Sequence, residues 1–170
     1  MKPEDIACLA RIKTRYGAYI DGAAMAHRHR PEVLAGIMLR ETRGGESTLL
    51  DVQGPAGKGD SGHGHGLMQI DDRSFPEFCH SEDWWDPLLN IEFGARVLAG
   101  KRKTLVKMCV RASIVLTPDE LERAAIAAYN CGEGNVFKTI VRKENVDLHS
   151  AHGDYSKSVL EYAEAYKGLV

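Results

Sequence analysis

Residues 54–71 have the glycine-rich sequence GPAGKGDSGHGHGLMQID. Six glycines lie in this run, with Asp60 inside it and Asp71 at its end. Because glycine adopts backbone conformations closed to other residues, the run predicts a flexible loop whose backbone lies open to a ligand. Glu41 stands upstream, and a loop with carboxylates set near a half-buried glutamate is typical of active sites that use acid and base catalysis.

The segment before the glycine run places Glu41 on the apolar face of a helix. Leu34, Ile37, Met38 and Glu41 fall at positions i, i+3, i+4 and i+7, the spacing of a stripe that faces a core. Burial there would raise the pKa of the carboxyl toward neutrality, as a general acid requires. The simpler alternative puts Glu41 at the helix end, where the stripe reaches solvent. The helix alone favours this alternative, because ion pairs with neighbouring arginines also perturb carboxylates.

Apolar spacing and capping signals predict a mainly helical chain with little sheet. Residues 117–120, Thr-Pro-Asp-Glu, give the clearest helix start, with a hydroxyl cap, a proline in the first turn and a glutamate three residues after the cap. Two short strands are expected beside the glycine run, at residues 48–52 and 67–71. Helices are expected over about residues 4–20, 31–41, 86–112, 118–129, 135–142 and 155–166, with Gly94 and Gly100 as points at which the third divides. The fold class is therefore mainly α, an α+β single domain with a small β-hairpin region.

Composition and charge exclude several classes of partner. The chain has 170 residues, 44% hydrophobic and 27% charged, which is typical of an ordinary globular domain with its own core. Its net charge of -2 provides no global positive field, so we expect no nucleic acid and no membrane surface as partner. No apolar run approaches the roughly 18 residues needed to cross a bilayer.

The cysteines and the N-terminus bear on the compartment. Four cysteines contain no CxxC pair and could form two disulfides, but reduced, partly buried thiols are favoured in a chain of this size: Cys8, Cys79, Cys109 and Cys131. The first 17 residues, MKPEDIACLARIKTRYG, carry acids at 4 and 5 and basic residues from 11 onward. They lack the apolar region of a signal peptide.

Two other patterns in the glycine run are weak. Residues 57–62 satisfy GxGxxG, but a dinucleotide site needs a helix to open there, and the glycines that follow exclude one. An HxH pair with a cysteine and a histidine beyond it could bring metal ligands together, yet such a pair in a mobile loop is more simply explained as exposed side chains: His63, His65, Cys79 and His80. The sequence therefore predicts no metal and no other cofactor.

The order of the motifs resembles that of the goose-type lysozymes and, more distantly, of the soluble lytic transglycosylase-like domains. The motifs are GIMLRE ending at Glu41, the glycine run ending in GLMQID, AYNCGEGNV at residues 128–136, and Asp-Tyr-Ser at residues 154–156. GLMQID and AYNCGEGNV are specific in combination, whereas GLMQ alone indicates only the wider superfamily. The resemblance covers about residue 33 to the C-terminus. It implies a lysozyme-like α+β domain, with residues 1–30 as an N-terminal helical extension and residues 31–170 as the goose-type catalytic core.

The resemblance also implies roles for particular residues. Glu41 matches the family's general acid, and Asp60 and Asp71 match the aspartates that position or activate the hydrolytic water. The side chains that match the lining of the sugar-binding cleft are Gln69, Tyr129, Asn130 and Tyr155. Thr42 stands where the family usually has serine, so the hydroxyl is kept. The chain departs from vertebrate members in a longer spacing between Glu41 and Asp60.

The implied activity is that of a peptidoglycan hydrolase, an N-acetylmuramidase that cuts the β-1,4 bond between N-acetylmuramic acid and N-acetylglucosamine by inversion. Two alternatives stay open. One is a lytic transglycosylase, which yields 1,6-anhydromuramoyl products, and the other is a non-catalytic cell-wall-binding module. The module is disfavoured because every family carboxylate position is occupied.

The resemblance implies peptidoglycan glycan strands as the partner of a monomeric chain, and it leaves open a proteinaceous lysozyme inhibitor. The cysteines do not follow the secreted animal pattern, which favours a bacterial or phage origin. With no visible signal peptide, we expect the chain to be made in the cytoplasm. It would then act on the cell wall, in the periplasm or outside, after release, non-classical export or phage delivery.

Overall fold

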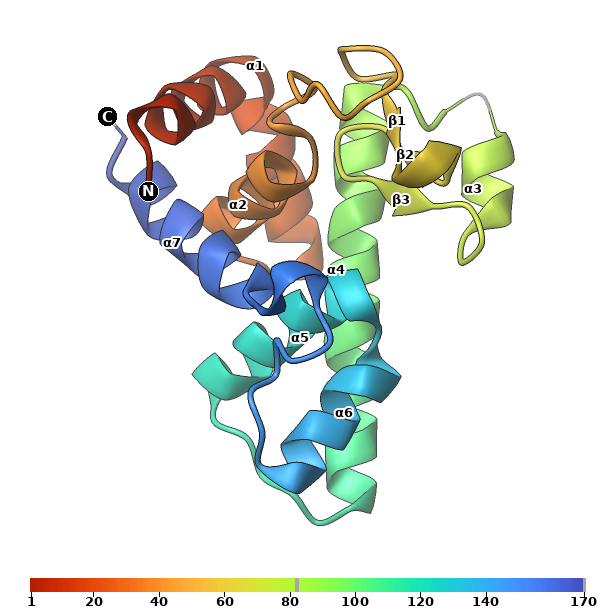
Figure 1. Cartoon of the computed structure of the whole chain (residues 1–170), viewed down its shortest axis with the longest axis vertical. Coiled ribbons are helices and arrows are strands. Elements are labelled where there is room, and N and C mark those ends of the chain that lie inside the picture. Colours follow the sequence, from red (N-terminus) through yellow and green to blue (C-terminus); the bar gives the residue numbers. More distant parts are fainter. Residues whose placement is uncertain (82, 170) are drawn as a thin grey trace. The chain divides into compact units, whose positions relative to one another are not determined.

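The computed structural model describes residues 1–81 and 83–169, and within them it is mainly helical with one small antiparallel sheet (Figure 1). This confirms the predicted fold class. No helix in the described ranges is both long and apolar enough to span a membrane. The elements, in chain order, are α1 (Pro3–His27), α2 (Pro31–Thr42), β1 (Lys58–Gly59), η1 (Asp60–Gly62), β2 (Gly64–His65), β3 (Ile70–Asp71), α3 (Pro76–His80), α4 (Pro87–Arg111), α5 (Pro118–Cys131), α6 (Glu133–Arg142), η2 (Ala151–Gly153) and α7 (Tyr155–Lys167).

The strands lie inside the glycine run and not beside it. The strand predicted at residues 48–52 is wrong, because that segment forms turns and bends that leave Leu49 88% exposed. Of residues 67–71, only the last two form a strand. Strand propensity does not predict the strand positions here, because each strand has only two residues. The pairing depends on small residues in register and not on β-branched side chains.

The helices begin within two residues of the predicted positions, but α1 runs further than expected and α4 is not divided. Thr117 accepts a hydrogen bond from Glu120 N at 3.3 Å and caps α5, as predicted. α1 continues past residue 20 to His27. Neither Gly94 nor Gly100 divides α4. Gly94 packs closely, since a Cβ there would lie 2.8 Å from Met68 Cβ, so its small size serves packing and not a break. The short α3 was not predicted.

The chain forms two compact units. Unit 1 comprises Met1–Ala95 and Glu161–Val170, and unit 2 comprises Arg96–Leu160. In unit 1, α1 packs on α2 (Figure 1), and buried side chains on both helices form its core, among them Leu9, Ile12, Leu34, Ile37 and Met38. The core of unit 2 includes the fully buried Leu105, Ile126, Val136 and Val159. The predicted boundary between an extension at residues 1–30 and a core at 31–170 stays a prediction.

All four cysteines are free thiols. Cys8, Cys79 and Cys109 are buried and Cys131 is half-buried. Burial raises the pKa of each thiol, and it raises the pKa of Cys79 to about 11. Because the thiolate is the reactive species, the folded chain should hold these thiols in an unreactive state.

We therefore predict that the native protein reacts slowly with iodoacetamide at pH 8, whereas the protein in guanidinium reacts at all four thiols within the same time. Mass spectrometry of the alkylated chain measures both numbers. A sample reduced beforehand is the control. Fewer than four labelled thiols in denaturant without reduction would contradict the absence of disulfides.

Candidate active site

Glu41 lies in the last turn of α2. The helix begins at Pro31, and Leu34, Ile37 and Met38 are fully buried along the stripe that leads to Glu41, which is half-buried. The helix ends because Arg43 takes a left-handed conformation, with φ of 53°. The predicted phase is thus correct, and the carboxylate stands where the buried stripe gives way to solvent.

Thr42 ties the end of this helix to the hairpin. The side chain is fully buried, and its hydroxyl lies 2.8 Å from Leu67 O and 3.3 Å from Met38 O. A hydroxyl has one proton, so the shorter contact to Leu67 O takes it. The same oxygen accepts from Gly45 N at 3.2 Å. Leu67 lies in the turn between β2 and β3, so the residue next to Glu41 is bonded directly to the segment that leads to Asp71.

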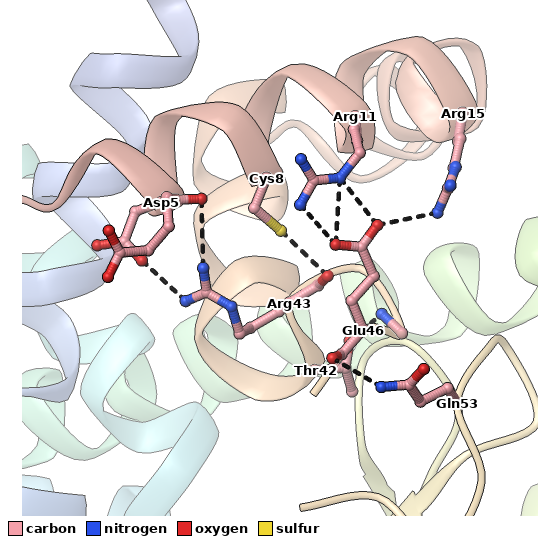
Figure 2. A network of polar contacts seen from close by, with 10 residues as sticks. Asp5, Cys8, Arg11, Arg15, Thr42, Arg43, Glu46 and Gln53 are labelled. Atoms are coloured by element: carbon pink, nitrogen blue, oxygen red, sulfur yellow. Dashed lines mark hydrogen bonds and ion pairs between the residues drawn. The ribbon is translucent and has the colours of Figure 1, made fainter. Parts of the chain in front are cut away.

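The segment after Glu41 is also held by α1 (Figure 2). Arg43 Nη1 donates to Asp5 Oδ1 at 2.8 Å, and Cys8 Sγ donates to Arg43 O at 3.1 Å. Burial acts to raise the pKa of Asp5, but the bonds from Arg43 and Lys2 outweigh it, so the pKa is lowered. This carboxylate therefore stays ionised and holds the arginine that ends α2.

Glu46 is the second residue after Glu41 whose side chain bonds to α1 (Figure 2). Its carboxylate accepts three bonds from Arg11, the shortest 2.6 Å from Nη2, and one from Arg15 Nη1 at 3.1 Å. The hydrogen bonds from Arg11 lower the pKa of Glu46. Gln53 Nε2 donates to the backbone oxygen of Glu46 at 3.3 Å, so the longer loop of this chain is attached to the same point.

The strand register explains two of the glycines. Gly59 pairs with Gly64, and Gly64 pairs with Asp71, so these three residues form one row across the sheet and share a face. The side-chain oxygen of Gln69 lies against Gly59 and Gly64, where a Cβ on either residue would collide with it. Gln69 Nε2 donates to Gly66 O at 2.8 Å and to Gly57 O at 3.3 Å. Gln69 thus braces the loop from the face that carries Asp71, and its contact with sugar stays a prediction.

Asp60 and Asp71 are brought together by Arg73. Arg73 Nε donates to Asp71 Oδ1 and Nη2 donates to Asp60 Oδ2, each at 2.6 Å. Asp60 lies at the start of η1 with its side chain 65% exposed, whereas that of Asp71 is 32% exposed. Asp71 Oδ2 also accepts from Ser74 N at 3.1 Å and from Ser74 Oγ at 2.7 Å. Burial acts to raise the pKa of Asp71, but the bonds from Ser74 and Arg73 outweigh it and lower the pKa.

The two histidines of the HxH pair have different surroundings. His63 Nδ1 lies 2.8 Å from Asp72 Oδ1. His65 is 3% exposed and meets Trp84 edge to face, with ring centroids 4.9 Å apart. The expectation that both are exposed loop side chains is wrong for His65, because its strand position turns the ring toward the tryptophan. Within residues 1–81 and 83–169, no three His, Cys, Asp or Glu side chains gather as metal ligands.

The remaining predicted residues lie in unit 2. Tyr129 is half-buried near the end of α5, and Asn130 Oδ1 accepts from Ala151 N at 2.8 Å. This bond joins α5 to the turn η2 before Tyr155, which opens α7 and is 1% exposed. The structure thus divides the predicted site residues into a carboxylate group in unit 1 and a Tyr-Asn-Tyr group in unit 2. Their contact with substrate stays a prediction.

Two residues that position these groups were missed from the sequence. Asp147 is fully buried and accepts from Ser156 N at 2.8 Å and from Ser156 Oγ at 2.6 Å, which fixes the first turn of α7 next to Tyr155. The polar segment around Asp147 carries no pattern that indicates such a role. Arg73 could have been noticed, since it stands two residues after Asp71.

The family model for lysozyme g matches residues 5–169. The chain belongs to the lysozyme g family. It is 34% identical to lysozyme g of Casuarius casuarius over 137 residues, which are 81% of this chain and 64% of that protein. It is 35% identical to lysozyme g of Gallus gallus over 137 residues, 81% of this chain and 56% of that protein. With lysozyme g of Struthio camelus the identity is 31% over 153 residues, 90% of this chain and 66% of that protein.

Membership of the lysozyme g family confirms the resemblance inferred from GLMQID and AYNCGEGNV. The family match begins at residue 5 and so includes α1, whose contacts hold the segment after Glu41. The chain spans between about half and two thirds of the length of the lysozyme g relatives named above.

The Thr42 hydroxyl gives a stability prediction. Thr42→Val keeps the shape of the side chain but leaves Leu67 O without its partner, whereas Gly45 N keeps its bond to the backbone oxygen of residue 42. The substitution should lower the free energy of unfolding by about 1–3 kcal/mol. Thr42→Ser is the matched control, because it keeps the hydroxyl and loses only a methyl group, at a cost of about 0.8 kcal/mol. Chemical denaturation measures both variants. Equal stability of the two would show that the hydroxyl does not hold the hairpin to α2.

Proposed function

We propose that this chain is an N-acetylmuramidase that hydrolyses the β-1,4 bond between N-acetylmuramic acid and N-acetylglucosamine in peptidoglycan. Membership of the lysozyme g family supports lysozyme activity as a glycoside hydrolase. The observation that carries the proposal to a mechanism is the pair of carboxylates, Asp60 and Asp71, bound to one guanidinium on a hairpin that is bonded to the Glu41 helix through Thr42.

Glu41 is the general acid of this proposal. Breaking a glycosidic bond requires a proton on the leaving oxygen, and the donor must be protonated near the working pH. A half-buried position at the end of an apolar stripe disfavours the charged form of a carboxyl group. We therefore assign the proton donor to Glu41, and its raised pKa stays a prediction.

Asp71 and Asp60 act on the opposite side of the reaction. An inverting glycosidase holds its second carboxylate about 6.5–9.5 Å from the acid, so that a water molecule fits between them and the sugar. Because the bonds from Ser74 and Arg73 lower the pKa of Asp71, this group is ionised at neutral pH. An ionised carboxylate orients the attacking water and stabilises the positive charge that grows at the anomeric carbon.

The proposal also includes the residues that bind the glycan strand and the place where the chain acts. Gln69 in unit 1, and Tyr129, Asn130 and Tyr155 in unit 2, would contact the glycan strand. We expect the chain to work as a monomer on the cell wall after its release from the cytoplasm, and a proteinaceous inhibitor is a partner to test for.

Removal of the acid should abolish the reaction. Glu41→Gln keeps the size of the side chain and loses the proton donor, so clearing of a cell-wall suspension should fall to the background rate. Asp60→Asn and Asp71→Asn should each slow hydrolysis by more than about tenfold. Arg142→Gln, at an exposed position at the end of α6, is the control and should retain the wild-type rate. Retained clearing by Glu41→Gln would overturn the assignment of the acid.

The products distinguish hydrolysis from transglycosylation. A muramidase uses water and leaves a reducing muramic acid end, which is about 18 Da heavier than the 1,6-anhydro end that a lytic transglycosylase leaves. Mass spectrometry of digested peptidoglycan should show reducing ends only. Anhydro ends would establish the transglycosylase and would remove the need for an aspartate that positions water.

A further inference from the structure

Arg73 makes an unusual use of its guanidinium. The Nε and Nη2 atoms stand on the same edge of the group, and in proteins this edge commonly binds both oxygens of one carboxylate. Here the edge is shared, with Nε bound to Asp71 and Nη2 bound to Asp60, both at 2.6 Å. One side chain therefore sets the position of one carboxylate relative to the other.

The two carboxylates are held to different degrees. Asp71 is anchored through both oxygens, by Arg73 on Oδ1 and by Ser74 on Oδ2. Asp60 is the more exposed of the two and receives its bond from Arg73 through Oδ2. The fixed member of the pair is Asp71, and Arg73 transmits its position to Asp60.

The backbone around Asp60 needs such support. Asp60, Ser61 and Gly62 have φ values of 49°, 57° and 95°, all in the left-handed region that is unfavourable for residues with a Cβ. A turn of this kind persists when surrounding contacts determine it. The β1–β2 pairing closes this turn on both sides. The segment after β3 adds two contacts, since Asp72 N donates to His63 O at 3.0 Å and Arg73 binds Asp60 in a pair whose side chains are 59% and 65% exposed.

Charge gives Arg73 a second task. Two carboxylates at one site repel each other, and a cation between them offsets the repulsion. An arginine keeps its charge at every pH at which the protein is folded. Titratable groups near the pair include His63 and Asp72, which bond to each other, and Cys79 of α3, whose pKa is raised by burial and in part by the charges of Asp72 and Asp71, and lowered in part by that of Lys58.

We propose that Arg73 is the positioning residue of this site, which holds the Asp60 turn on Asp71 and presents the two carboxylates as a fixed pair. This inference rests on the proposed function, because it requires that both carboxylates act on the reaction. Arg73 touches neither the scissile bond nor the water in this scheme, and it acts through Asp60 and Asp71, to which it is bonded.

A double-mutant cycle tests the proposal. Arg73→Gln should lower kcat on purified peptidoglycan glycan strands by about tenfold to a hundredfold. It should change KM by less than about threefold, because the substitution removes the positioning of the carboxylates and not the binding of substrate. Arg73→Gln in the Asp60→Asn background should lower kcat by a smaller factor than in the wild-type background, because only the bond to Asp71 remains to be lost. Arg73→Lys keeps a charge but not the shared edge, so it should recover part of the loss.

Arg142→Gln should behave as wild type, and thermal unfolding of each variant reports whether the hairpin remains folded. A wild-type kcat in Arg73→Gln, or losses from Arg73→Gln and Asp60→Asn that multiply in the double variant, would overturn the role of Arg73 alone. Normal rates in both Asp60→Asn and Asp71→Asn would instead overturn the proposed function, and the Arg73 proposal with it.

Discussion

The packing of Gln69 over two glycines is the constraint on which the hairpin depends. Its side-chain oxygen occupies the space in which Gly59 or Gly64 would carry a Cβ, and its nitrogen bonds to the backbone of Gly57 and Gly66. Because Gly59 and Gly64 stand in register with Asp71, a larger residue at either position would displace Gln69 and disturb the strand pairing that places Asp71. Packing thus accounts for Gly59 and Gly64, whereas Gly54 and Gly62 have open space around them and positive φ values of 115° and 95° that favour glycine.

Two kinds of contact hold the end of α2, and their expected strengths differ. Solvent-exposed ion pairs such as those from Arg11 and Arg15 to Glu46 contribute about 0–1 kcal/mol each. A buried hydroxyl whose partners lose their hydrogen bonds costs about 1–3 kcal/mol. Thr42 should therefore contribute more to the position of Glu41 than either of the exposed ion pairs that Arg11 and Arg15 make with Glu46. The contacts of α1 add a second support to the same turn, and the family match includes most of this helix.

The sequence predicts what is local and fails where position depends on tertiary packing. The start of α5 is predictable because Thr117 and Glu120 bond within one turn, and the half-burial of Glu41 follows from helical phase. The strand at residues 48–52 is wrong because propensity carries little information when pairing depends on glycines and one glutamine.

The contacts of Arg73 and Asp147 show the same limit. Arg73 is close in sequence to Asp71, but its bond to Asp60 spans 13 residues and exists only once the hairpin has formed. Asp147 reaches Ser156 across 9 residues of irregular chain, so no periodic pattern announces it. The family resemblance supplied the roles of the carboxylates, and the structure supplied the arginine that joins two of them.

In the proposed mechanism, Asp60 and Asp71, paired by Arg73, direct water to the face of the sugar opposite Glu41. The most direct test is the configuration of the first-formed product, followed by proton NMR during digestion of a defined muramic acid oligosaccharide. Hydrolysis of the β-linkage by inversion predicts that the α-anomer of the reducing end appears first and then equilibrates. Initial formation of the β-anomer would contradict this assignment, since retention requires that a carboxylate of the protein or the acetamido group of the sugar, and not water, attacks the anomeric carbon first.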